Sequence, residues 1–219
     1  SWYFCGESGV FIKTTDAGNT WFINNKAGKK IINYISAQVY TSLQKVHFFN
    51  SITGIVIGDA NSILRTTNGG ISFDSVHIEP SYPNSNWRDM VWINGQTGFM
   101  CGTAYPNSIR RSTNSGITWD TIGGYLISGN YIRTADRIWT ADGVTIFAIS
   151  DATPNFVYRS SNGGDNWAVI PCGLVGPYQL CINFMNASTG FIGGTNGRMA
   201  RTTDGGFNWI AFNSPLGTA

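Results

Sequence analysis

An eight-residue pattern, called the octet below, occurs five times and restricts the fold more than any other feature of the sequence. Each copy opens with two hydroxyl residues, continues through Asp or Asn and a glycine, and closes on Trp or Phe. The copies are TTDAGNTW at 14–21, TTNGGISF at 66–73, STNSGITW at 112–119, SSNGGDNW at 160–167 and TTDGGFNW at 202–209. The closing aromatics stand at 21, 73, 119, 167 and 209, so successive copies lie 52, 46, 48 and 42 residues apart. Such intervals are typical of four-stranded propeller blades.

A second pattern precedes four of the octets: an apolar strand, a polar turn, and a second strand that ends on a glycine or another small residue. It occurs at 46–58, 90–102 and 182–193, and in a degenerate form at 138–148. Each unit therefore predicts an inner, a second, a third and an outer strand, and radial stacking lets each sheet cover its neighbour. We predict an all-β fold, a β-propeller of four-stranded antiparallel blades in a single domain or propeller fragment. The expected blades are approximately 1–44, 45–88, 89–136, 137–179 and 180–219.

The first unit lacks an inner strand, because Trp2–Cys5 aligns with the second strand of the later units. Residues 210–219 form too short a segment to supply that strand convincingly. Two arrangements stay open: a five-bladed ring closed through an imperfect terminal strand, or part of a six- to eight-bladed ring. The chain does not start with Met and shows no signal peptide at its start, so we expect a processed protein or a piece of a longer one.

The octet itself reads as a structural turn. An Asp or Asn side chain accepts backbone N–H groups of its own turn, glycine supplies positive φ, and the aromatic fills the space between sheets. Three copies carry Asn, so the charge is dispensable, which argues against calcium. The expected structural residues are Asp16, Trp21, Asn68, Phe73, Asn114, Trp119, Asn162, Trp167, Asp204 and Trp209.

The octet resembles the Asp-box, or BNR repeat, of sialidase-type propellers. The fuller pattern, RTTNGG at 65–70 and RTTDGG at 201–206, resembles the photosystem II stability/assembly factor type of propeller over essentially the whole chain. The resemblance implies the fold. It does not select a function, because such repeats also occur in sialidases, xyloglucan-active hydrolases and sortilin-like receptors.

The strand order places the loops after each second strand on the same face as the loops between blades, opposite the octets. That face is a candidate binding face, because Tyr, Trp and Arg dominate interface hot spots; the alternative is that long loops simply expose a few aromatics. Its candidate residues are Glu7, Asp59, Tyr82, Trp87, Arg88, Tyr105, Tyr125, Tyr131, Arg133, Arg137, Asp151 and Tyr178.

One cation precedes each octet, namely Lys13, Arg65, Arg111, Arg159 and Arg201. We expect each to pack over the neighbouring blade or to bond a turn carbonyl. The alternative, an anion-binding role for this row, is the less favoured one.

Nothing in the sequence selects a catalytic site. Glycoside hydrolysis needs two carboxylates across a cleft, and only Asp59, Asp89 and Asp151 are plausible members. Neither His47 nor His77 has triad-like neighbours. We therefore expect a non-enzyme without a cofactor.

The four cysteines show no zinc-binding pattern, so no metal site is expected. Cys5 and Cys101 occupy apolar strand positions and read as buried thiols. Cys172 and Cys181 lie nine residues apart, so they could form a disulfide, which spacing alone does not decide.

The sequence thus favours a non-catalytic protein-interaction or scaffolding propeller outside the cytoplasm, as an assembly factor or a module of a larger secreted or surface protein. The alternative is a carbohydrate-binding or glycoside-hydrolase propeller that uses the aromatic loop face. A net charge of +2 without a basic run argues against nucleic acid. The absence of an apolar stretch of ~20 residues argues against membrane insertion.

Overall fold

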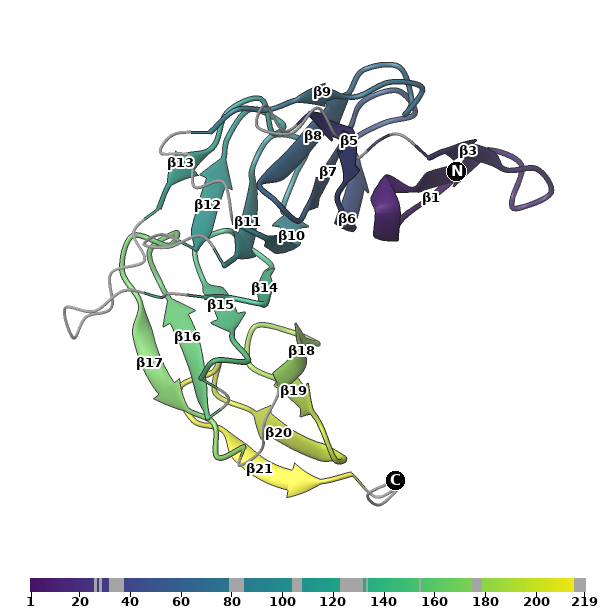
Figure 1. Ribbon diagram of the computed structural model, residues 1–219. Coiled ribbons are helices and arrows are strands. Elements are labelled where there is room, and N and C mark those ends of the chain that lie inside the picture. The colour runs from purple at the N-terminus through teal and green to yellow at the C-terminus, as the bar shows by residue number, and fades with distance from the viewer. Residues whose placement is uncertain are drawn as a thin grey trace.

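The computed structural model describes residues 1–25, 27, 29–31, 38–78, 85–103, 108–122, 132, 134–153, 155–174 and 179–214. It is built from antiparallel strands, with one short 3₁₀ turn at Glu7–Gly9. Apart from one two-stranded hairpin, five larger sheets follow one another along the chain, and we call them blades 1 to 5. They fan out along an open arc whose two ends lie apart (Figure 1). The described residues thus do not close into a five-bladed ring, and the number of blades in a larger ring stays a prediction.

Blades 2 to 5 each contain four strands in sequence order, as predicted. The inner strands β6, β10, β14 and β18 line the concave side of the arc, and the outer strands lie on the convex side (Figure 1). Blade 2 consists of β6 (Leu43–Phe48), β7 (Gly54–Gly58), β8 (Ser62–Thr66) and β9 (Asp74–Ser75); blade 3 of β10 (Trp87–Trp92), β11 (Gly98–Gly102), β12 (Ile109–Ser112) and β13 (Asp120–Thr121); blade 4 of β14 (Arg137–Thr140), β15 (Ile146–Ile149), β16 (Phe156–Ser160) and β17 (Ala168–Pro171); blade 5 of β18 (Gln179–Phe184), β19 (Gly190–Gly194), β20 (Arg198–Thr202) and β21 (Ile210–Asn213).

Blade 1 has three strands, β1 (Trp2–Cys5), β2 (Phe11–Thr14) and β3 (Phe22–Asn24). These correspond to the second, third and outer strands of the later blades, as expected from the missing inner strand. A two-stranded hairpin, β4 (Lys29–Ile31) with β5 (Gln38–Tyr40), lies between blades 1 and 2 in the sequence.

Every octet folds into the same hydrogen-bonded turn. In the second copy the Thr66 hydroxyl accepts the N–H of Gly70 at 2.9 Å, and Oδ1 of Asn68 accepts the N–H of Ser72 at 3.0 Å. Gly70 has φ +84°, which L side chains rarely adopt. The other four copies repeat both bonds at the equivalent positions. The Asp copies and the Asn copies therefore build the same turn.

The closing aromatics fill the spaces between blades. Trp119, Trp167 and Trp209 are buried in the apolar clusters between their own blade and the preceding one, and Phe73 is partly buried in the same way. Trp21 differs, because 42% of it is exposed. It belongs to the face of blade 1 that no described blade covers.

In blades 1 to 4 the cation before the octet joins its blade to the next one. Nζ of Lys13 donates to the carbonyl of Gly69, and Nε of Arg159 donates to the carbonyl of Gly205 at 3.0 Å. Arg65 and Arg111 do the same with Ser115 and Gly163 at 3.4 Å. The preferred interpretation of this row, bonding to turn carbonyls, is thus confirmed for four of its five members. The fifth, Arg201, is exposed at the open end of the arc.

Candidate binding sites

The candidate binding face is only partly described. Glu7, Asp59, Arg88, Arg137 and Asp151 belong to the described residues and keep at least part of their surface exposed. Outside the described residues lie Tyr82, Tyr105, Tyr125, Tyr131, Arg133 and Tyr178. For these six residues the binding role stays a prediction.

The prediction that Trp87 belongs to the binding face is wrong. This residue is the first of β10 and is fully buried in the apolar cluster between blades 2 and 3. Its indole Nε1 donates to Oδ1 of Asn61 at 2.9 Å, so its polar atom is also satisfied inside the protein. Trp87 therefore stabilises the junction and does not present a ring to a partner.

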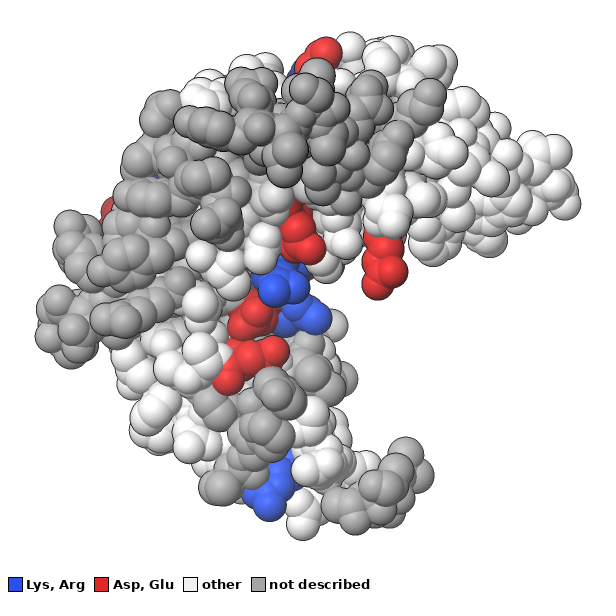
Figure 2. Space-filling model, viewed as in Figure 1, with Lys and Arg blue, Asp and Glu red and all other residues white. Residues whose placement is uncertain are grey.

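Charged side chains gather where the inner strands of blades 2, 3 and 4 begin. We call this set the inner-rim cluster; it comprises Lys45, Arg88, Asp89, Asp136, Arg137 and Asp151. Nζ of Lys45 lies 2.7 Å from Oδ1 of Asp89, and Oδ2 of Asp89 accepts the N–H of Ile138 at 3.3 Å, so Asp89 links three blades. Figure 2 shows acidic and basic side chains side by side along the concave edge of the arc.

Asp151 is the least satisfied member of the inner-rim cluster. Burial and the nearby Asp136 carboxylate raise its pKa above the ordinary range, although Arg137, the Gln179 N–H and Arg88 act in the opposite direction. Its Oδ1 is buried without a hydrogen-bond partner among the described residues, as is Nε of Arg88. Such buried polar atoms cost free energy unless a partner or water satisfies them.

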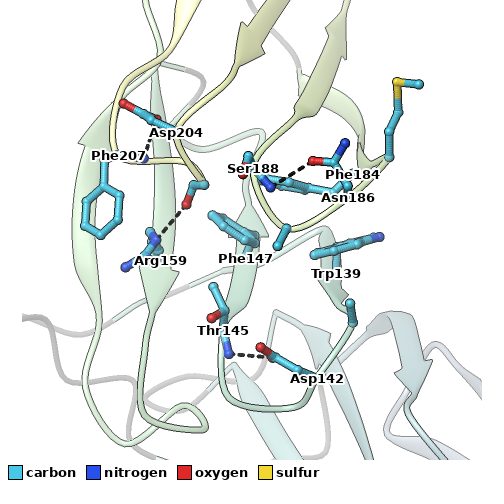
Figure 3. Close-up of a pocket in the computed structure, with 14 residues that line it drawn as sticks. Trp139, Asp142, Thr145, Phe147, Arg159, Phe184, Asn186, Ser188, Asp204 and Phe207 are labelled. Atoms are coloured by element: carbon cyan, nitrogen blue, oxygen red, sulfur yellow. Dashed lines mark hydrogen bonds between the residues drawn. The ribbon is translucent and has the colours of Figure 1, made fainter.

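A cavity of about 460 Å³ lies between blades 4 and 5 on the octet face. We call it the 4/5 hollow. Its floor is an aromatic stack in which the Phe184 ring lies 4.6 Å from that of Trp139 and 4.3 Å from that of Phe147. Figure 3 shows these rings between the inner turn of blade 4, which carries Asp142, and that of blade 5, which carries Asn186. Its size falls within the range of small-ligand sites.

The strand register explains part of this opening. In blades 2, 3 and 5 the inner strand ends on an aromatic that faces a glycine across the sheet, as Phe184 faces Gly190. A Cβ on that glycine would lie 2.6 Å from the Phe184 ring, so the aromatic needs the glycine. Blade 4 reverses the sizes, with Thr140 facing Ile146.

The next position along the inner strand completes the explanation. Blade 2 carries Phe49 there, and its ring packs edge-on against Trp92 of blade 3 at 4.6 Å and 89°. Blade 4 carries Ala141 at the equivalent position, so no ring from that position packs over Phe184. The 4/5 hollow is the space that remains.

Asp142 is the second unusual residue of this inner turn. Its Oδ1 accepts the N–H groups of Val144 and Thr145 at 2.8 and 2.7 Å. Asn50, Asn94 and Asn186 make the same two bonds in blades 2, 3 and 5. Partial burial raises the pKa of Asp142, but the bonds from Thr145 and Val144 outweigh it and hold the pKa below its ordinary value. The carboxylate is therefore charged at neutral pH, although the turn does not need the charge.

The opposite side of the 4/5 hollow carries a cation. The guanidinium of Arg159 lies 3.9 Å from the centroid of the Phe207 ring and is held there by the carbonyl of Gly205. Asp204 lies beside it, and the side chain and backbone N–H groups of Asn208 lower the pKa of Asp204 to about 2. In Figure 3 Arg159 and Phe207 lie across the cavity from Trp139. This side of the hollow thus carries charges of both signs, whereas the Asp142 side carries a carboxylate.

The remaining expectations concern cysteines and metals. Cys172 and Cys181 are not joined by a disulfide. Burial raises the pKa of the Cys101 thiol and, to about 11, that of Cys5. Within the described ranges no group of three or more His, Cys, Asp or Glu side chains is placed to hold a metal ion. The same ranges contain no helix that is long and apolar enough to cross a membrane.

Sequence comparison identifies no relative: no family model matches the chain, and no curated protein matches it. Solved structures do match. A structure of YCF48 bound to a D1 peptide has a TM-score of 0.60 and 14% identity over 79% of this chain and 55% of its own. YCF48 from Cyanidioschyzon merolae has a TM-score of 0.57 and 17% identity over 99% of this chain and 81% of its own.

Glycoside hydrolases match as well. An ancestral GH74 enzyme has a TM-score of 0.70 and 21% identity over 96% of this chain, which spans only 29% of that enzyme. At these identities the likeness establishes the fold and no more. The chain is a β-propeller that resembles YCF48 and the GH74 enzymes in its fold.

Proposed function

We propose that the chain is a non-catalytic propeller that binds another protein through the inner-rim cluster. The observation that carries this proposal is the mixed and partly exposed charge of the inner-rim cluster, in which Arg88, Arg137 and Asp151 keep part of their surface exposed. A polypeptide offers side chains of both signs and can pair with both the basic and the acidic members of the cluster. The likeness in fold to a propeller whose structure includes a D1 peptide supports the same class of partner.

The sign pattern of the inner-rim cluster supports a protein over nucleic acid. Basic and acidic side chains alternate along it, whereas the phosphate groups of nucleic acid bind to surfaces that are uniformly positive. We also propose that the octet is of the Asp-box type and that the protein works outside the cytoplasm. These two assignments rest on the octet pattern, the low charge content and the resemblance stated above.

A glycoside-processing propeller is the second candidate, because Asp151 has a raised pKa, as a general acid requires. The likeness in fold to GH74 enzymes points the same way. One observation weighs against it. The carboxylate nearest to Asp151 is Asp136, whose Oδ2 accepts the backbone N–H of Asp151 at 2.8 Å, so the two acids lie side by side and not across a cleft.

The test uses charge-neutral variants of similar shape. Arg88→Gln and Asp151→Asn each leave the strands intact but remove one charge from the inner-rim cluster. Asp120→Asn, on the exposed outer strand β13, is the matched control. Proteins captured from an extract of the source organism are compared between the wild type and the variants, and affinities are then measured with the purified partner.

We expect a partner whose affinity falls at least tenfold in both inner-rim variants and stays unchanged in the control. Turnover of a β-glucan that Asp151→Asn abolishes would replace the proposal with the second candidate. A partner that binds all variants equally would place the binding surface elsewhere.

A further inference from the structure

The 4/5 hollow is independent of the inner-rim cluster. The two sites lie at opposite ends of the β14–β15 hairpin, since Arg137 faces Ile149 at one end and Thr140 faces Ile146 at the other. A ligand of the hollow therefore need not contact the inner rim.

The hollow combines two features that the fold itself does not require. A ring at the position of Ala141 is compatible with a blade, because blade 2 carries Phe49 there. An amide at the position of Asp142 is compatible as well, because blades 2, 3 and 5 carry Asn there and form the same turn. The open floor and the negative charge at its edge thus occur together in blade 4, which lacks the aromatic–glycine pair that blades 2, 3 and 5 share.

We propose that the 4/5 hollow binds a basic side chain, Lys or Arg, of a polypeptide. Its aliphatic stem would lie over Trp139 and Phe184, and its charged end would lie beside the Asp142 carboxylate. Aromatic faces attract cations, and a carboxylate next to them adds a hydrogen-bonded ion pair. In taking the cation from a polypeptide, this inference rests on the proposed function.

The geometry also fixes the direction of the bound side chain. Near Phe207 the Asp204 carboxylate already has Arg159 beside it, so a second cation is favoured at the Asp142 side. Met185 at the rim is 77% exposed and offers a flexible apolar contact for a residue next to the cation. A sugar could also stack on Trp139, but its binding would not depend on the charge of Asp142.

The experiment is an NMR titration of the ¹⁵N-labelled protein. The probes are N-acetyl-arginine amide, N-acetyl-lysine amide, their neutral analogue N-acetyl-citrulline amide, and cellotetraose. The indole N–H of Trp139, assigned with Trp139→Phe, reports occupancy of the hollow. We expect a saturable shift with arginine or lysine, with a dissociation constant on the order of 1 mM, and binding of citrulline at least tenfold weaker.

Two variants copy residues that other blades carry at the same position, so both should fold. Asp142→Asn should weaken arginine binding about fivefold to tenfold, because it removes one partly exposed ion pair between the ligand and the protein. Ala141→Phe should abolish binding by filling the hollow. Asp120→Asn is the control and should leave the titration unchanged.

Three results would overturn the inference: no shift of the Trp139 signal with either cation, equal affinity for arginine and citrulline, or an affinity unaffected by Asp142→Asn. Cellotetraose binding that survives Asp142→Asn, in the absence of cation binding, would assign the hollow to a carbohydrate. These outcomes are separate from those for the proposed function, because the probes do not require the inner rim. Arg88→Gln should leave the titration intact even if it abolishes partner capture.

Discussion

The junction between blades 2 and 3 and the junction between blades 4 and 5 share one frame but differ at the inner turn. At both, an Arg of one blade donates to a carbonyl of the next octet, and a buried octet Trp closes the apolar cluster. At the first, the Phe49 ring also packs on Trp92. At the second, Ala141 leaves that place open, and a cavity of about 460 Å³ results.

The difference shows that holding the blades together and shaping their surface involve separate residues. The octet, the cation and the closing aromatic recur in each junction and set the distance between blades. The inner turn lies beside them and accepts a smaller residue without loss of the frame. A repeat protein can therefore open a cavity at one junction by substitutions within a single inner turn.

The largest expected effect concerns the shared frame. Trp119→Ala and Trp209→Ala should each lower the free energy of unfolding by about 3–5 kcal/mol, because both rings are buried between blades. Trp21→Ala, at the uncovered face of blade 1, should cost less than about 1 kcal/mol. Urea unfolding of the three variants measures this. Equal losses at all three positions would contradict the packing described for blade 1.

The next effect concerns the large and small residues that face each other at the end of the inner strand, Phe184 and Gly190 in blade 5. Gly190→Ala should cost about 1–3 kcal/mol, because its Cβ would meet the Phe184 ring. In a Phe184→Thr background, which copies Thr140 of blade 4, the same change should be close to neutral. A double-mutant cycle from urea unfolding isolates this coupling. A coupling energy near zero would show that the ring does not depend on the glycine.

A smaller effect concerns the cation between blades. Arg159→Met should lower the free energy of unfolding by about 1 kcal/mol, since the hydrogen bond to Gly205 is lost at a partly exposed site. Arg65→Met should cost somewhat less, because its bond to Ser115 is longer at 3.4 Å. Arg201→Met is the control, and its stability should not change. A loss for Arg201→Met equal to that for Arg159→Met would rule out the interblade bond as the cause.

The smallest effect is a pH dependence of turn stability, which should differ between octets with Asp and octets with Asn. Asn208 holds the pKa of Asp204 at about 2, below its ordinary value, so this bond stabilises the turn above pH 4 and is lost as the pH falls through 2. The octet of blade 4 carries Asn162 and should not respond. Hydrogen exchange of the Asn208 and Asn166 amides between pH 4 and 2 tests this, after correction for intrinsic rates. Protection that falls equally at both amides would contradict the assignment.

The sequence was sufficient for the fold because the octet repeats at blade spacing and each of its residues has a local task. Thr66 and Asn68 close their turn without help from distant residues, so their roles could be read from one segment. The missing inner strand of blade 1 and the bonding role of the cations followed from the same alignment.

The sites were harder to predict, because they depend on which side chains of neighbouring blades lie opposite one another. Trp87 stands next to a loop in the sequence, but β10 turns it into the junction, where Asn61 satisfies its indole. The 4/5 hollow was missed because its signal is an absence, Ala141 where blade 2 has Phe49. An alignment of the degenerate segment 138–148 with the inner strands of the other blades would have shown that Ala141 takes the place of Phe49.

The most direct test of the account is a crystal structure of Ala141→Phe beside that of the wild type. We predict that the introduced ring packs over Phe184 as Phe49 packs on Trp92, that the 4/5 hollow closes, and that the frame of the junction does not move. An introduced ring that points to solvent above an unchanged cavity would contradict the claim that the size of residue 141 controls the hollow.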